Sequence, residues 1–214
     1  MRFLLSLPLP RATLRLADFG CGIGLYLMML EKAGIFRADQ MCGIDSAYDV
    51  STRVMDGNTL IHPDFQQDQT FDIILLMHVL EHIENDASVL RLVSGKCRSG
   101  GYLFISVPAF QTLWSSHDVF LGHYRRYNKT SLIELIQASP ALKLENIYYY
   151  YASILPVVII ARWLKKNRQP DGSDLKPAPS IINRLLLAIL NAESKCAPYN
   201  RLAGLSVIAV CKKL

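Results

Sequence analysis

The run from Asp18 to Gly24 is the clearest candidate ligand-binding motif in this chain of 214 residues. Its glycines allow a tight turn and a close approach of the backbone to a ligand, and a helix that begins there offers free N–H groups. Asp45 follows Gly24 by 21 residues, where a carboxylate can accept hydrogen bonds from both ribose hydroxyls. The spacing predicts a site for a nucleoside-containing cofactor.

Two cofactor classes compete for this motif. A nicotinamide dinucleotide site requires glycine at position 25, where the sequence has Leu25, and its pyrophosphate disfavours a carboxylate such as Asp18. A cofactor with a cationic amino-acid end tolerates that carboxylate. A plain glycine turn beside a solvated Asp45 needs no cofactor at all. We favour the cationic cofactor, because the turn and the second carboxylate occur at the right separation.

The segment from Trp114 to Tyr127 concentrates histidine, arginine, aspartate and aromatic side chains in a predicted loop. Histidine suits a general base near neutral pH, and arginine can hold an anionic group through paired hydrogen bonds. We take His117 or His123 as the base. The residues expected to contact the substrate are Trp114, Asp118, Tyr124, Arg125 and Arg126. A solvated loop whose arginines cap the next helix is the alternative.

His78, Glu81 and His82 stand at the carboxyl end of a predicted strand, where open α/β sheets bind ligands. If the segment is helical from residue 78, all three side chains share one face and suit a zinc ion or a harder divalent ion. A structural role at the start of a helix explains the same pattern. We expect no metal, and we keep His78 as a third candidate catalytic residue.

Predicted strands alternate with predicted helices, which is typical of a mostly parallel sheet covered on both faces. The expected strands are 13–19, 41–45, 71–77, 102–107, 143–151 and 204–212. The expected helices are 20–33, 85–96 and 129–138. We expect one domain over residues 1–214, with a helical, apolar and basic insertion at 151–200 that contains a flexible linker.

Four stretches, LADFGCGIG, GIDS, FDIILLMHVLEHI and SGGYLFISVPA, resemble successive motifs of class I S-adenosylmethionine (SAM)-dependent methyltransferases, of the type 11 and type 12 groups. The resemblance covers residues 13 to about 135. It implies an α/β, Rossmann-like sheet of seven mostly parallel strands with an antiparallel last strand, and SAM as the cofactor. The cofactor contacts that it implies are Asp18, Gly20, Cys21, Gly22, Gly24, Asp45, Ser46, Asp56 and Met77.

The same resemblance bears on three further positions. An acidic or amide group after the third strand usually meets the adenine, so Asn58, Asp64 and Asp68 are alternatives to Asp56. HVLEH resembles the ExxEH of ubiquinone-biosynthesis O-methyltransferases, with His78 in place of the first carboxylate. The loop VPAFQTLWSSHDVFLGHYRRY resembles methyltransferases of glycan or lipid-carrier metabolism. Relatives carry a helical segment before the glycine motif, and about a dozen residues stand there in this sequence.

Composition and charge indicate the cellular location and the kind of surface that the protein meets. The five cysteines lack the pairing of metal or disulfide frameworks, and the apolar start is too short and too rich in proline for an export signal, so we expect a cytoplasmic protein. Residues 1–150 carry 13 basic and 15 acidic side chains, whereas residues 151–214 carry 10 and 3. A basic region beside apolar runs favours an anionic membrane surface over nucleic acid.

The insertion has two apolar segments, Asn146 to Ala161 and Ile181 to Leu190, flanked by basic residues and by Trp163. The first is shorter than the roughly 18 residues that span a bilayer, and Pro156 interrupts it. Helices of this kind lie in a membrane interface, here at the inner face of the membrane. A cap packed on the sheet, or a homodimer surface, uses the same stripes.

These patterns favour transfer of a methyl group from SAM to an oxygen, in preference to a nitrogen, of a lipid-linked, glycan or quinone-like acceptor. The reaction mainly requires alignment of acceptor and methyl group, which can supply about 7–11 kcal/mol. The alternative from another class is a catalytically silent partner that binds SAM or docks on a membrane. A nicotinamide oxidoreductase ranks third.

Overall fold

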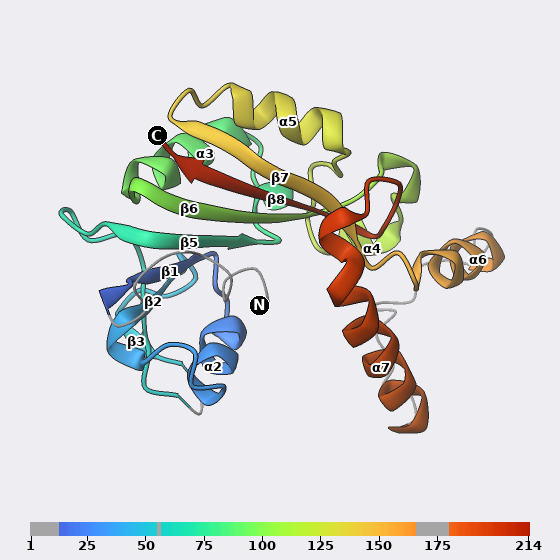
Figure 1. Cartoon of the computed structure of the whole chain (residues 1–214), viewed down its shortest axis with the longest axis horizontal. Coiled ribbons are helices and arrows are strands. Elements are labelled where there is room, and N and C mark those ends of the chain that lie inside the picture. The colour runs from blue at the N-terminus through green and yellow to red at the C-terminus, as the bar shows by residue number, and fades with distance from the viewer. Residues whose placement is uncertain (1–12, 55–56, 166–179) are drawn as a thin grey trace.

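The computed structural model describes residues 13–54, 57–165 and 180–214 and centres on one eight-stranded sheet (Figure 1). The strands are β1 (Leu16–Phe19), β2 (Met41–Ile44), β3 (Thr52–Arg53), β4 (Leu60–His62), β5 (Phe71–Met77), β6 (Cys97–Pro108), β7 (Leu142–Tyr150) and β8 (Ser206–Lys213). The α-helices are α2 (Leu25–Lys32), α3 (Asp86–Lys96), α4 (Ser116–Phe120), α5 (Lys129–Gln137), α6 (Leu155–Lys165) and α7 (Ser180–Cys196). Short 3-10 turns cover Ala38–Gln40, Leu80–His82, Gln111–Leu113 and Ala197–Tyr199.

The strand order is β3-β4-β2-β1-β5-β6-β8-β7, with β8 antiparallel to both of its neighbours. Strands β4, β2, β1, β5 and β6 run parallel. The predicted α/β class and the antiparallel last strand are confirmed. The sheet has one strand more than the expected seven, because β3 adds a two-residue antiparallel pair at the edge. Strands as short as β3 and β4 show no readable alternation in the sequence.

The glycine turn delays the first helix. The expected helix at 20–33 begins at Leu25, because Gly20, Gly22 and Gly24 all have positive φ, at 71°, 52° and 76°. A residue in that region ends right-handed helical geometry. The expected helices at 85–96 and 129–138 lie within a residue of α3 and α5, which are capped by the side chains of Asn85 and Asn128.

Helices cover both faces of the sheet (Figure 1). On one face, α3 and α5 contribute Leu90, Leu132 and Ile136 to a buried cluster with the strands. On the other face, Leu27 and Leu30 of α2 join a second buried cluster. The sheet is therefore buried from both sides in its centre, as a parallel sheet requires.

The remaining helices lie beyond the carboxyl ends of the parallel strands. Strands β5, β6 and β7 all end toward α4, α6 and α7, which project past the sheet (Figure 1). Within the described ranges, no helix has both the length and the apolar character needed to cross a membrane. The expected insertion is helical where it is described, and its assignment to one domain with the rest of the chain stays a prediction.

Candidate active site

The glycine turn lies at the carboxyl end of β1 and is fixed by backbone hydrogen bonds. The N–H of Gly20 donates to the carbonyl of Ile44 at 2.7 Å, which joins the turn to the end of β2. A Cβ at Gly20 or Gly24 would collide with Val79 or Val54, whereas a Cβ at Gly22 would meet no atom within 4 Å. The turn thus packs against the protein on two sides and presents Gly22 to open space.

Asp45 folds over this turn from the end of β2. Its Oδ2 accepts the N–H of Gly22 at 2.7 Å, and its Oδ1 accepts the N–H of Ala47 at 2.9 Å. The hydroxyl of Tyr48 donates to the carbonyl of Gly22 at 3.2 Å. Each carboxylate oxygen has a second lone pair, so Asp45 keeps acceptor capacity for two hydroxyl groups of a ligand.

Asp18 is buried beneath the turn and is incompletely paired. Its side chain is 1% exposed, and Oδ2 has no hydrogen-bond partner among the described residues. Burial, and then the nearby charge of Asp45, raise the pKa of Asp18 to about 7. A cationic group at the turn would pair with this oxygen and stabilise the ionised form. Asp18, Gly22 and Asp45 therefore fit a cofactor with an ammonium group and a ribose.

His78 occupies the carboxyl end of β5 in a left-handed conformation, with φ at 61°. Such a backbone costs about 1–3 kcal/mol for a non-glycine residue, and strain of this kind clusters at functional sites. Its N–H donates to the carbonyl of Ser106 at 2.8 Å, which holds the strained residue in place. The condition for a shared helical face, a helix from residue 78, is not met, because only a 3-10 turn follows and it begins at Leu80.

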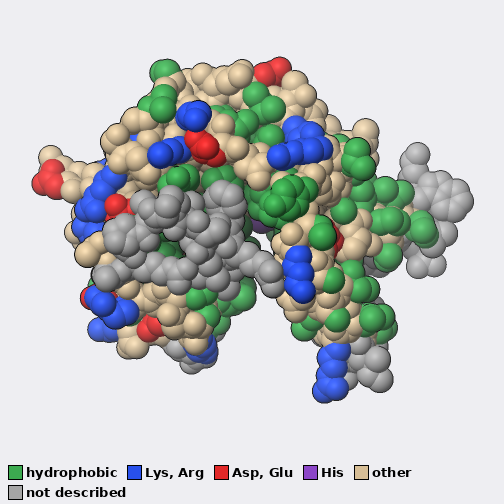
Figure 2. Space-filling model, in the orientation of Figure 1, with side chains coloured by type: hydrophobic (Ala, Val, Ile, Leu, Met, Phe, Trp, Pro, Cys, Tyr) green, Lys and Arg blue, Asp and Glu red, His purple; other side chains and the backbone are tan. Residues whose placement is uncertain are grey.

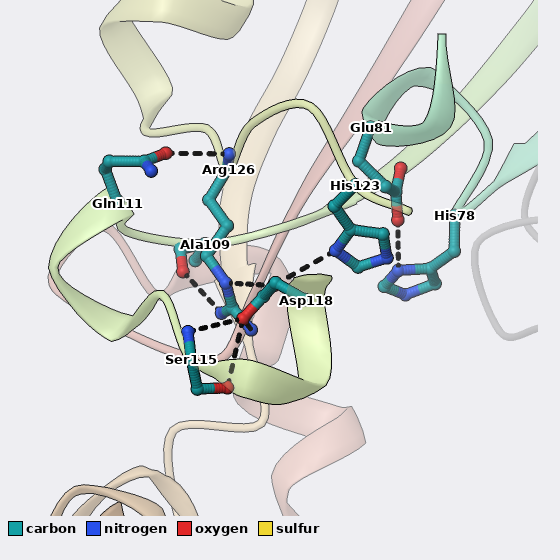
Figure 3. A network of polar contacts seen from close by, with 8 residues as sticks. All are labelled: His78, Glu81, Ala109, Gln111, Ser115, Asp118, His123 and Arg126. Carbon is teal, nitrogen blue, oxygen red and sulfur yellow. Dashed lines mark hydrogen bonds and ion pairs between the residues drawn. The ribbon is translucent and has the colours of Figure 1, made fainter. Parts of the chain in front are cut away.

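The imidazole of His78 is oriented at both nitrogens. Nδ1 lies 3.0 Å from Oε1 of Glu81, whose side chain is fully buried (Figure 3). Nε2 lies 3.1 Å from Oγ of Ser106. A carboxylate only accepts hydrogen bonds, so Nδ1 carries the hydrogen and Nε2 keeps its lone pair. The His78 side chain is 40% exposed, which leaves it accessible to a substrate. This pairing is the arrangement of a general base with an orienting carboxylate.

Glu81 also faces two further histidines. Single ligand atoms of Glu81, His82 and His123 lie within 4.8 Å of one another, and the rings of His82 and His123 meet edge to face at 4.6 Å. Oε2 of Glu81 has no hydrogen-bond partner among the described residues. Among the described residues, these three form the group that could hold a metal ion. The sequence suggested His78 with Glu81 and His82, whereas in the structure His123 takes the place of His78 in this group.

A second polar cluster surrounds Asp118, whose side chain is fully buried (Figure 3). Arg126 donates to its two oxygens at 2.6 and 3.1 Å, and Nδ1 of His123 lies 3.0 Å from Oδ1. The backbone N–H of Ser115 donates to Oδ2 at 2.8 Å. Burial would raise the pKa of Asp118, but the hydrogen bonds and charge of Arg126 outweigh it and lower the pKa.

The polar groups of this cluster find hydrogen-bond and ion-pair partners within the protein. The side chains of Arg126 and His123 are each 7% exposed, so Asp118 and Arg126 are placed to fix the loop around α4. Arg125 instead lies at the surface and binds Asp86 at 2.9 Å and the carbonyl of Glu84 at 2.6 Å. The expected substrate contacts of these residues stay predictions.

The other expected site residues stand at or after the carboxyl ends of β2, β5 and β6. Tyr124 is 54% exposed, Trp114 is half-buried, and Nδ1 of His117 is buried without a hydrogen-bond partner among the described residues. Ser46 is exposed beside Asp45, and Met77 is half-buried at the end of β5. Their contacts with a ligand stay predictions.

The described residues expected to contact the adenine lie at opposite ends of the strands. Asp56 lies outside the described residues. Asn58 precedes β4, donates twice to Glu31 and lines a surface pocket with Arg15 at the amino ends of the strands. Ligands bind at the carboxyl ends of such strands, which favours Asp64, two residues after β4.

Comparison with known proteins identifies the family. A model described as a methyltransferase domain matches residues 1–139. The chain belongs to this methyltransferase domain family. The prediction of a SAM-dependent methyltransferase, with SAM as cofactor, is confirmed at the level of the family. A solved SAM-dependent methyltransferase from Archaeoglobus fulgidus has the same fold, with a TM-score of 0.58 and 15% identity over 99% of this chain and 91% of that chain.

Curated relatives of this methyltransferase chain carry the name ubiquinone biosynthesis O-methyltransferase. The protein from Hydrogenovibrio crunogenus is 32% identical over 101 residues, which are 42% of this chain and 40% of the relative. The protein from Bordetella bronchiseptica is 24% identical over 171 residues, or 74% of this chain and 63% of the relative. The chain thus spans less than two thirds of the length of either relative.

Three residues near the site were not foreseen. Ser106 contacts His78 from β6, Tyr151 follows β7 directly, and Glu193 of α7 accepts hydrogen bonds from the turn after Tyr151. Ser106 is unremarkable in sequence, because its contact depends on the pairing of β5 with β6. The run of four tyrosines at 148–151 at the end of a strand was a usable signal.

Proposed function

We propose that this methyltransferase transfers a methyl group from SAM to a hydroxyl oxygen of a quinone-like, lipid-linked acceptor. The observation that carries the proposal is His78, an accessible imidazole whose Nδ1 is fixed by the buried Glu81 and whose Nε2 keeps the lone pair. A base of this kind accelerates transfer to a hydroxyl acceptor, and the names of the curated relatives support oxygen and a quinone.

The glycine turn and its two carboxylates would hold the donor. Asp18 pairs with the ammonium group, Asp45 accepts the ribose hydroxyls, and Gly22 lets the backbone lie close to the ligand. When bound, SAM supplies a methyl group on a positively charged sulfur, which leaves as the neutral thioether of S-adenosylhomocysteine. The chain's own task is to align the acceptor oxygen with that methyl group.

His78 would take the proton of the acceptor hydroxyl at Nε2 as the new carbon–oxygen bond forms. Before this step the acceptor hydroxyl must replace Ser106 Oγ as the partner of Nε2. Glu81 stabilises the resulting imidazolium through Nδ1. His117 and His123 are the competing bases. The side chain of His123 is only 7% exposed, against 40% for His78, so His78 is the more accessible of the two to a substrate.

The test is a transfer assay with methyl-labelled SAM and a lipid extract, followed by identification of the labelled product by mass spectrometry. We expect a lipid-soluble methyl ether. The His78→Asn variant, which tolerates the left-handed backbone, should lose about 10²–10⁴-fold in kcat while its SAM affinity stays unchanged. The variants His117→Asn and His123→Asn are the comparison.

Three results would overturn parts of this proposal. SAM binding without any transfer would favour a silent binding partner. A labelled amine would move the acceptor to nitrogen. A full loss of kcat in His117→Asn or His123→Asn, with His78→Asn unaffected, would reassign the base.

We also propose that the enzyme works at an anionic membrane surface on the cytoplasmic side. Helices α6 and α7 expose apolar side chains on the flank of the molecule (Figure 2). These are Val157, Ile159 and Ile160 on α6, and Ile182, Leu185, Leu187 and Ile189 on α7. Residues 151–214 carry a net charge of +7, from 10 basic and 3 acidic side chains. A homodimer that covers the same helices is the alternative outcome.

A further inference from the structure

A pair of tyrosines lies where β7 ends and the following turn begins. This is the side of the sheet formed by the carboxyl ends of the parallel strands, where the glycine turn also lies. Tyr151 has φ at 62°, an outlier for a bulky side chain, and the rings of Tyr150 and Tyr151 are 4.2 Å apart at their centroids. Strands β6 and β7 are both antiparallel to β8 and therefore run in the same direction, so their carboxyl ends lie on the same side of the sheet. The strained turn therefore lies on the ligand-binding side of the sheet.

Glu193 holds this turn from α7. Its Oε1 accepts the N–H of Ala152 at 2.7 Å, and its Oε2 accepts the N–H of Ser153 at 3.0 Å and also the hydroxyl of Ser153. No other acidic residue occurs between Ser180 and Cys196. A single carboxylate thus fixes both backbone N–H groups that follow Tyr151.

The same strand end is packed closely from behind. A Cβ at Gly204 would lie 2.2 Å from the carbonyl oxygen of Tyr150, so only glycine permits this approach. The side chain of Asn200 donates to the carbonyl of Tyr149 at 3.2 Å. These contacts leave Tyr150 and Tyr151 little freedom to move, which is what a preorganised binding surface requires.

A third tyrosine, on α2, interacts electrostatically with Tyr151 of this pair. Tyr26 is one residue into the helix that begins after the glycine turn, and its phenol interacts electrostatically with Tyr151 and with Asp18. Burial, and then Tyr151 and Asp18, raise the pKa of Tyr26, so its hydroxyl stays protonated and can donate. Burial, followed by Glu193, does the same for Tyr151. Tyr26 thus interacts both with the tyrosine pair and with Asp18, the residue proposed to bind the ammonium group of the cofactor.

We propose that Tyr26, Tyr150 and Tyr151 form the subsite for the aromatic ring of the acceptor, with Glu193 as the positioning residue. The proposal rests on the proposed function and narrows its substrate to a catechol or hydroquinone. Aromatic faces stack on a flat ring, and two neutral phenols donate hydrogen bonds to its oxygens.

The position of Glu193 gives the subsite a connection to the surface. Leu185, Leu187 and Ile189 are exposed on the same helix, one or two turns before Glu193. Glu193 therefore belongs to the helix that is proposed to meet the membrane.

The test uses the full chain saturated with S-adenosylhomocysteine, with 4-methylcatechol as a soluble probe and calorimetry as the readout. Tyr151→Gly removes the ring and suits the left-handed backbone, so the fold is retained. We expect catechol affinity to fall about tenfold, with S-adenosylhomocysteine affinity unchanged. The matched control is Tyr199→Ala, which removes a tyrosine that is 82% exposed.

Glu193→Ala should weaken catechol binding to a similar extent and raise the KM for catechol more than it lowers kcat, while Glu193→Gln should restore part of the affinity. The subsite proposal is overturned if the wild type does not bind catechol, or if Tyr151→Gly leaves its affinity unchanged. It is also overturned if that variant weakens S-adenosylhomocysteine instead, which would make the tyrosines part of the donor site.

Failure of the proposed function gives a different result. Tyr151-dependent catechol binding without methyl transfer would support the subsite and contradict the proposed reaction. Methyl transfer to a catechol that is equally fast in Tyr151→Gly would support the reaction and contradict the subsite.

Discussion

Arg126 and Asp118 form a two-pronged ion pair inside the protein, with Nε to Oδ1 at 2.6 Å and Nη2 to Oδ2 at 3.1 Å. Both side chains are almost inaccessible to solvent. A buried carboxylate that loses such a partner keeps its desolvation cost without compensation. The pair therefore anchors the loop between β6 and α5, which carries the residues expected to meet the acceptor.

Arg126→Met should lower the free energy of unfolding by about 3–5 kcal/mol, measured by urea denaturation. The matched control is Arg125→Met, which removes a half-exposed partner of Asp86 and should cost about 1 kcal/mol or less. Asp118→Leu added to Arg126→Met should recover much of the loss. Equal effects of the two arginine variants would contradict the structural role of Arg126.

The buried Asp18 should make the stability of the ligand-free protein depend on pH. Its pKa is about 7 in the folded chain, against an ordinary value near 3.8. Between these values the folded chain keeps a proton that the unfolded chain has released, so stability falls as pH rises from about 4 to about 7. Above pH 7 this contribution levels off.

Asp18→Asn removes the titrating group and should flatten that slope. The measurement is the free energy of unfolding at several pH values, taken as the difference between wild type and variant. A difference that stays constant from pH 4 to pH 7 would show that Asp18 is ionised throughout.

Activity should survive treatment with EDTA. The ligand atoms of Glu81, His82 and His123 lie within 4.8 Å of one another, a looser limit than the roughly 3.3 Å that bonds of about 2.0–2.1 Å to zinc set between neighbouring ligands. Oε1 of Glu81 is also paired with Nδ1 of His78. Loss of activity with EDTA, and recovery with one divalent ion, would instead make this group a metal site.

The protein should sediment with vesicles that contain anionic lipid at low salt and come off in part at high salt, because salt screens the attraction. Leu185→Glu on α7 should weaken this binding, and Lys165→Glu with Lys166→Glu or Trp163→Ala should do the same, without changing SAM affinity. The matched control is Leu202→Glu, at an 88% exposed leucine outside the helices. Equal recovery with neutral and anionic vesicles would favour a cap or a dimer surface.

Local patterns predicted the features that depend on neighbouring residues in the chain. The alternation of strands and helices and the glycine turn both have short-range signatures and are confirmed. The strand pair β3 and β4 was missed because each strand is two or three residues long. The partners of His78 could be foreseen only at Glu81, since Ser106 reaches it through the pairing of β5 and β6.

Polar residues clustered in sequence proved harder to interpret. The loop from Trp114 to Tyr127 predicts a substrate site by composition, yet its most polar members, Asp118 and Arg126, pair with each other in the interior. No short-range rule separates a buried ion pair from two ligand contacts. The converse applies to Glu193, whose link to the turn at Ala152 and Ser153 spans about forty residues of chain.

Calorimetry of SAM binding to wild type and to Asp45→Ala tests the central claim most directly, since the proposed reaction begins with a donor held by the glycine turn and Asp45. The loss of two charge-assisted hydrogen bonds should weaken binding by about 1–3 kcal/mol, or roughly 5- to 150-fold in Kd. Asp49→Ala, at an exposed carboxylate four residues away, should bind SAM as the wild type does. Unchanged SAM affinity in Asp45→Ala, with the variant still folded, would contradict this account.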